Sequence, residues 1–111
     1  MKFKVTPTDK FKKEAKRLSR KYPSLNTDLA ELGSILERTP SIGTALGRNI
    51  FKVRLAIKSK GKGKSGGARV ITYLVTEEFE VYLLTIYDKS ELETVDNRLL
   101  RRIVEGISFE N

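Results

Sequence analysis

Cysteine, histidine and tryptophan are all absent from this chain of 111 residues. Without cysteine and histidine, the chain cannot form a disulfide bond, a zinc finger, or a catalytic site built on a thiol or an imidazole. Catalysis would have to use lysine, arginine, tyrosine, hydroxyl groups or carboxylates. No stretch approaches the ~18 apolar residues of a membrane-spanning helix, and the basic N-terminus lacks the apolar region of a secretory signal. We therefore expect a soluble, cytoplasmic protein without a membrane partner.

Positive charge is what the chain has in excess. It carries 22 lysine and arginine residues against 14 acidic ones, a formal net charge of +8 at pH 7. Such a surplus favours a polyanionic partner, which charge alone leaves open between nucleic acid, a ribonucleoprotein, an anionic membrane face and an acidic protein. The carboxylates form no cluster with metal-ligand spacing, so we expect no metal and no cofactor. The length suits one domain, residues 1–111, with a single modest core.

Hydrophobic periodicity predicts the order of the elements. A short strand, residues 2–5, comes first, and apolar residues then recur at helical spacing from Phe11 to Tyr22 and from Leu25 to Leu36. Thr6 is the expected N-cap of the first helix, with Pro7 at its first position. A turn-rich passage, residues 40–49, separates these helices from the strands.

Beyond that passage the period changes to that of strands. Residues 51–58, 68–75 and 79–87 are predicted to form an antiparallel meander, with a flexible connector rich in glycine and lysine at residues 59–67. A capping box at Ser90 begins a last helix, whose apolar face has Leu92, Val95, Leu99, Ile103 and Ile107. The order β-α-α-β-β-β-α predicts an α+β fold, a small and mostly antiparallel sheet with the helices packed on one face.

Basic residues gather on the face of the predicted sheet that is turned away from the helices. Lys52, Arg54 and Lys58 share one side of the first meander strand. Alternation along the next strand does not show which of its two sides is buried. Because burying an unpaired arginine would be costly, we expect Arg69 on the same cationic face. A phosphate chain could bind such a face, and bases could stack on its aromatic residues. The other residues expected to bind there are Tyr73, Tyr87, Lys89 and the loop residues Lys60, Lys62 and Lys64.

An ordinary solvated sheet face shows the same alternation of cations and apolar residues. Tyrosines in strands also pack more often than they bind bases. The pattern by itself therefore leaves a plain surface and a nucleic-acid site as alternatives.

A set of ordered segments adds to this interpretation. After the two helices come Leu46-Gly47, Phe51–Leu55, Gly66–Val70 and Leu84–Lys89. In this order they resemble the RelE/HigB group of toxins from type II toxin–antitoxin systems, part of the RelE/ParE superfamily, over nearly the whole chain. Members are small basic endoribonucleases that cleave mRNA, mostly in the ribosomal A site, and a cognate antitoxin neutralises them. The resemblance thus implies mRNA, the ribosome and an antitoxin as partners, and a RelE-like fold.

The resemblance also implies roles for individual residues. In the reaction of this family an RNA 2′-hydroxyl attacks the adjacent phosphorus without a metal. Lys52 and Arg54 correspond to the base region, Arg69 to the arginine that contacts the phosphate, and Lys89 to the proposed acid. The best-known members have a catalytic tyrosine further into the C-terminal segment, but the corresponding stretch here, residues 92–98, has no aromatic residue. Tyr87 is the candidate to replace it.

Two other functions remain open at this point. A toxin of the same fold could inhibit DNA gyrase, as in the ParE branch, without cutting RNA. A non-catalytic module could simply bind RNA through the basic face. The set Lys52, Arg54, Arg69 and Lys89 favours the nuclease, because the ParE branch usually lacks it.

Overall fold

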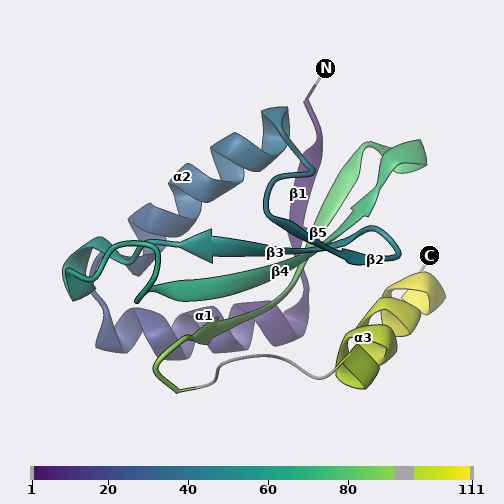
Figure 1. Ribbon diagram of the computed structural model, residues 1–111. Helices are drawn as coiled ribbons and strands as arrows, with labels where there is room; N and C mark the ends of the chain where they lie inside the picture. The colour runs from purple at the N-terminus through teal and green to yellow at the C-terminus, as the bar shows by residue number, and fades with distance from the viewer. Residues whose placement is uncertain (1, 92–96, 111) are drawn as a thin grey trace.

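The computed structural model describes residues 2–91 and 97–110, which form three helices and a five-stranded sheet (Figure 1). The α+β fold is confirmed, with one more strand than predicted. None of the helices in this part of the chain has the length and hydrophobicity to cross a membrane. The elements are β1 (Lys4–Pro7), α1 (Asp9–Lys21), α2 (Leu25–Arg38), β2 (Thr44–Gly47), β3 (Ile50–Leu55), β4 (Ala68–Val75), β5 (Glu80–Asp88) and α3 (Asn97–Glu110).

The strands lie in the order β1-β5-β4-β3-β2, with β1 parallel to β5 and all other neighbours antiparallel. The unpredicted strand, β2, lies at the edge of the sheet within the passage expected to be turns. All four of its residues are exposed, so no buried side marks it in the sequence. Arg48 and Asn49 link β2 to β3 with φ of 53° and 63°, the backbone of a tight hairpin turn.

The first helix begins later than predicted. Thr6 and Pro7 belong to β1, where they lie opposite Tyr82 and Leu83 of β5. The N-cap is therefore Thr8, whose hydroxyl accepts a hydrogen bond from the Phe11 amide at 3.3 Å. The prediction of Thr6 as the cap was wrong because pairing with β5 keeps the chain extended for two more residues.

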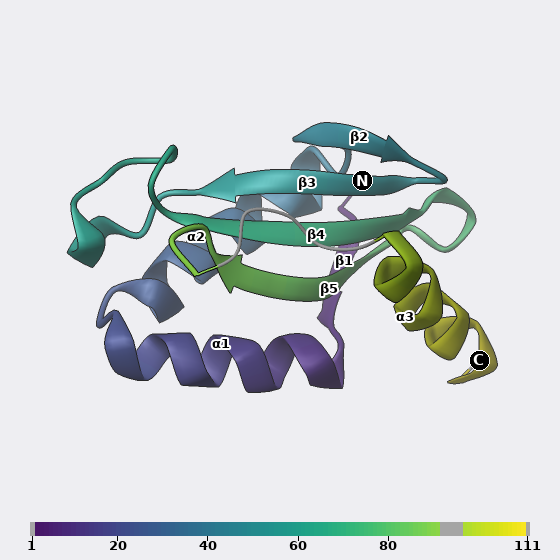
Figure 2. The ribbon, with the colours of Figure 1, turned by 60° about the horizontal axis from the view of Figure 1, so that its bottom comes forward.

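The helices cover both faces of the sheet, not one. Core residues of α1 and α2 pack on Val53, Val70 and Ile86, whereas α3 packs through Leu100 on Ile71 and Leu84. Val70 and Ile71 are neighbours on β4, so they point to opposite faces. In Figure 2, α2 lies behind the strands and α3 in front of them. A second layer is needed because β4 and β5 carry apolar side chains on both sides.

The position of α3 also differs in detail from the predicted apolar face. Leu100, 2% exposed, is its buried leucine, whereas Leu99 is 39% exposed. Ile103 packs beside Leu100 as expected. The predicted contacts of Leu92 and Val95, like that of the Ile107 side chain, lie outside the described residues.

Candidate active site

A pocket of about 410 Å³ opens on the face of the sheet that α3 partly covers. We call it the cationic pocket. Its position follows from the strand register: Lys52 on β3 lies opposite Thr44 on β2, and Arg54 lies opposite Arg69 on β4. Residues that are directly opposite share a face, so three cations project together. The pocket is lined by Thr44, Lys52, Arg54, Arg69 and Lys89.

These lining residues include four of the five that the sequence marked as catalytic. Four cations and a threonine carry no negative charge between them, and such a concave surface attracts and concentrates an anion. The site also contains Thr44, which the sequence did not reveal. Since β2 lacks a hydrophobic pattern, the only local signal was the turn at its end.

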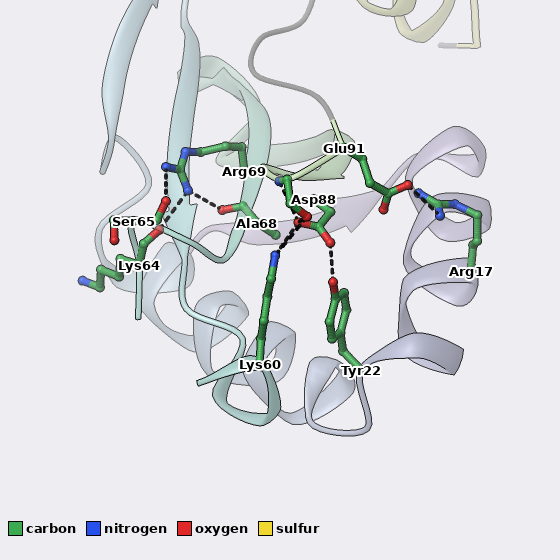
Figure 3. A network of polar contacts seen from close by, with 10 residues as sticks. Arg17, Tyr22, Lys60, Lys64, Ser65, Ala68, Arg69, Asp88 and Glu91 are labelled. Carbon is green, nitrogen blue, oxygen red and sulfur yellow. Dashed lines mark hydrogen bonds and ion pairs between the residues drawn. The ribbon is translucent and has the colours of Figure 1, made fainter. Parts of the chain in front are cut away.

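Arg69 has the face predicted for it, but it is buried, with 4% of its surface exposed. Backbone carbonyls take the place of the carboxylate partner that a buried arginine usually needs. Its Nη1 donates to the carbonyls of Lys64 and Ala68 at 2.9 and 3.0 Å, and its Nη2 to that of Ser65 at 3.3 Å (Figure 3). The carbonyls bind three of its donors without cancelling the charge, so the guanidinium keeps its field toward the pocket.

A second buried cation lies beside this site. The Nζ of Lys60 is 2.6 Å from Oδ1 of Asp88, and the two side chains are 9% and 0% exposed. The Tyr22 hydroxyl donates to the other oxygen of Asp88 (Figure 3). Ser90 donates to Oδ1 through its amide and its hydroxyl. The prediction of Lys60 as a surface cation for RNA was wrong, because this loop lysine is an internal partner of Asp88.

The hydrogen bonds decide the protonation of this pair. Burial alone would raise the pKa of Asp88, but the donors Lys60, Tyr22 and Ser90 outweigh it and hold that pKa well below its usual value. Burial would lower the pKa of Lys60, yet the bond to Asp88 leaves it raised. Both groups are therefore charged at neutral pH.

The connector at residues 59–67 is anchored at both ends. At its start, the Ser59 amide donates to the Ser24 hydroxyl at 2.8 Å, and Lys60 binds Asp88. At its end, the Gly67 carbonyl accepts from the Lys89 amide at 3.1 Å. Lys62 and Lys64 are exposed between these anchors, as predicted for loop cations.

Lys58 does not lie on the cationic face. The strand ends at Leu55, and Lys58 belongs to a single 3₁₀ turn, Lys58–Lys60. Its Nζ is 2.8 Å from Oε1 of Glu31 on α2, on the other side of the sheet, and this contact raises the pKa of Lys58. The prediction was wrong because the alternation of a strand was extended past the point where the chain turns.

Neither tyrosine of the predicted site lines the pocket. Tyr87 lies opposite Arg69 on the same face but is 6% exposed, and its hydroxyl has no hydrogen-bond partner within the described chain. Burial raises the pKa of Tyr87, and the charge of Arg69 opposes that shift. Tyr73 stacks on Tyr82 with ring centroids 6.4 Å apart and packs in the cluster under α3. Both rings are packing residues in this structure, not open platforms for bases.

No family model matches the sequence, but solved structures share its fold. A double arginine-to-alanine mutant of the toxin RelE from E. coli, in the free state, is 15% identical and aligns over 96% of this chain and 99% of its own, with a TM-score of 0.64. The chain has a RelE-like toxin fold. The crystal structure of the isolated E. coli RelE toxin, in its P21 form, is 19% identical over 95% of this chain and 98% of that one, with a TM-score of 0.54.

A toxin–antitoxin complex is also among the structures that resemble this RelE-like chain. A chain of the RelBE2 complex from Mycobacterium tuberculosis is 18% identical, aligned over 79% of this chain and 99% of that one, with a TM-score of 0.59. At such identities the likeness establishes the fold alone. The chemistry has to be argued from the residues of the cationic pocket.

Proposed function

We propose that this protein is the toxin of a type II toxin–antitoxin system, a metal-independent endoribonuclease that cleaves mRNA on the ribosome in the cytoplasm. The observation that carries the proposal is the cationic pocket. Four cations from three separate segments, β3, β4 and the residue after β5, line one concavity of a RelE-like fold, and no carboxylate of the described residues lines it with them. A phosphodiester is the group that such a site fits best.

The reaction would be an attack within the RNA itself. The 2′-oxygen bonds to the adjacent phosphorus, the bond from phosphorus to the 5′-oxygen breaks, and the products carry a 2′,3′-cyclic phosphate and a 5′-hydroxyl. Arg54 and Arg69 would stabilise the negative charge that grows on the phosphoryl oxygens. Lys52 would take the proton from the 2′-hydroxyl, and Lys89 would give one to the leaving 5′-oxygen.

The remaining residues have lesser roles in this proposal. Lys62 and Lys64 are exposed in the loop that holds Arg69, so they would bind phosphates that flank the scissile linkage. The buried Tyr87 hydroxyl would take no part in proton transfer. An antitoxin would have to neutralise the cationic pocket, and the RelBE complexes among the similar structures support such a partner.

The test is cleavage of mRNA on programmed ribosomes, with and without the Arg69→Ala substitution. We expect that Arg69→Ala and Lys89→Ala each abolish cleavage inside codons and relieve toxicity on expression. The matched control is Arg20→Ala, which removes an exposed cation on α1 outside the pocket. Circular dichroism checks that the Arg69→Ala protein is folded, and Lys89 is exposed, so its removal leaves the core intact.

Three results would contradict the proposal. Full cleavage by the folded Arg69→Ala protein would remove the catalytic assignment. Failure of DNA supercoiling before translation stops would favour the gyrase inhibitor. Tight RNA binding with no cleavage on ribosomes would favour the non-catalytic module.

A further inference from the structure

The buried carboxylate of Asp88 joins three segments that are far apart in the sequence. It ends β5, directly before Lys89 of the cationic pocket. Its partners are Tyr22, which follows α1, and Lys60 in the connector (Figure 3), together with the neighbouring Ser90. The Lys60 ammonium also lies 5.4 Å from the centre of the Tyr22 ring. We call Tyr22, Lys60 and Asp88 the anchor network.

The anchor network connects to the pocket through the connector. From Lys60 the chain turns, and the carbonyls of Lys64 and Ser65 then accept the hydrogen bonds of Arg69. Two residues further, the Gly67 carbonyl accepts from the amide of Lys89. The same short segment is therefore fixed at one end by Asp88 and holds two pocket cations at the other.

Gly67 holds the far end of the connector close against β3. A Cβ at this position would lie 2.1 Å from the carbonyl oxygen of Leu55, at the end of β3. Only glycine fits there, and the backbone of the connector is pressed against the strand that carries Lys52 and Arg54. The connector is thus held against β3 at Gly67 and bound to Asp88 at Lys60, and the Lys64 and Ser65 carbonyls that bind Arg69 lie between these two fixed points.

Stability alone is a poor reason for this arrangement. Taking an ion pair out of water costs nearly as much as its attraction returns, so buried pairs are often no better than apolar residues of similar size. The exposed pair of Lys58 and Glu31 ties down the same turn without that cost. The buried pair instead holds the connector in one conformation.

We propose that Asp88 and Lys60 are positioning residues, whose ion pair fixes the conformation of residues 60–67. In that conformation the Lys64 and Ser65 carbonyls direct the Arg69 guanidinium at the bound phosphate, and the Gly67 carbonyl holds the backbone of Lys89. This inference rests on the proposed function of the pocket. Misplacing a catalytic group by about 1 Å can cost on the order of 10²-fold in rate. Breaking the pair should therefore reduce the rate of cleavage rather than the affinity for RNA.

The experiment compares Asp88→Asn, Lys60→Met and the double variant in single-turnover cleavage, below the melting temperature of each protein. Each single variant leaves one buried charge unpaired and should lower both Tm and kcat. The double variant leaves no unpaired charge, so its Tm should recover, whereas kcat should stay on the order of 10²-fold below the wild type with little change in KM. The control Glu31→Gln breaks the exposed pair in the same turn and should leave kcat within about twofold, as expected for a rim charge.

Recovery of kcat together with Tm in the double variant would overturn the positioning role. An NMR measurement independent of cleavage follows the Nη resonances of Arg69, which should be resolved in the wild type, where carbonyls restrict its rotation, and averaged in the double variant. Unchanged Arg69 resonances would also overturn the inference. Cleavage by Arg69→Ala at the wild-type rate would instead refute the proposed function, and the NMR result would still decide whether the anchor network orients Arg69.

Discussion

Arg54 on β3 and Arg69 on β4 lie directly opposite each other, a cross-strand pair of like charges. Side chains opposed in this way are about 5 Å apart at Cβ, and like charges there destabilise a sheet. Arg54 is exposed, but Arg69 is buried and cannot turn away into solvent. The pair therefore costs stability where it stands. An anion bound between the two guanidinium groups would remove this cost.

Replacing Arg54 should therefore make the protein more stable and less active. Arg54→Thr removes the repulsion and introduces a residue suited to strands, so the free energy of unfolding should rise by about 0.5 kcal/mol. Cleavage should fall at least tenfold. Urea unfolding and the ribosome assay measure the two effects. The control Lys4→Thr replaces a cation that lies opposite Glu80, and it should bring no gain in stability.

Arg69→Lys should fail although it keeps the charge. The lysine ammonium cannot reproduce the planar fork that binds three carbonyls and presents the remaining donors to a phosphate. We expect a loss of cleavage on the order of 10²-fold. The kinetics of the purified protein measure it. A wild-type rate in the Arg69→Lys variant would show that only the charge at this position matters.

The affinity for RNA should fall as the salt concentration rises, more steeply the more phosphates the protein contacts. For single strands the slope of log K against log salt changes by about −0.7 for each phosphate that the protein neutralises. Titrations with an RNA that carries a 2′-deoxy residue at the cleavage position measure binding without turnover. Lys89→Ala should reduce the slope by about 0.7. Lys12→Ala, on the exposed side of α1, should leave it unchanged, and equal effects of the two would argue against a localised site.

The anchor network should make stability depend on acid. The pKa of Asp88 is depressed in the folded protein, so the unfolded chain takes up the proton first as pH falls. The stabilisation is complete above the unfolded pKa of about 4 and is lost below it, a change on the order of 2 kcal/mol. Urea unfolding between about pH 2 and pH 7 should show this loss in the wild type. The double variant Lys60→Met with Asp88→Asn should lose less, and parallel curves for the two proteins would contradict the assignment.

Two glycine substitutions should have opposite effects. Gly67→Ala places a methyl group against the Leu55 carbonyl, at 2.1 Å, and should cost on the order of 2 kcal/mol of stability and disturb cleavage. Gly33→Ala lies within α2, where a Cβ meets nothing within 4 Å, and should stabilise the helix by about 0.5 to 1 kcal/mol. Thermal unfolding of both variants measures the difference. Equal Tm values would show that the connector yields at Gly67.

Local patterns in the sequence predicted most of the elements. The apolar period placed the helix α2 up to Arg38 and the strand β4 at residues 68–75, where the structure has them. It missed β2 because an edge strand exposed on every residue has no period to detect. It placed the first helix too early because pairing of Thr6 and Pro7 with β5 is a contact between distant residues.

Local patterns likewise predicted only some of the residues of the candidate site. The sequence by itself determined that Lys52 and Arg54 share a face, because side chains alternate along any strand. Only the tertiary structure decided that Lys58 leaves that face and that Lys60 is buried. Asp28 on α2 accepts the Lys58 amide at 3.1 Å and Asp88 binds the Lys60 ammonium, contacts between residues 30 and 28 positions apart in the chain. A local period cannot predict where such long-range contacts end a strand, and those contacts determine which of the many cations form the pocket.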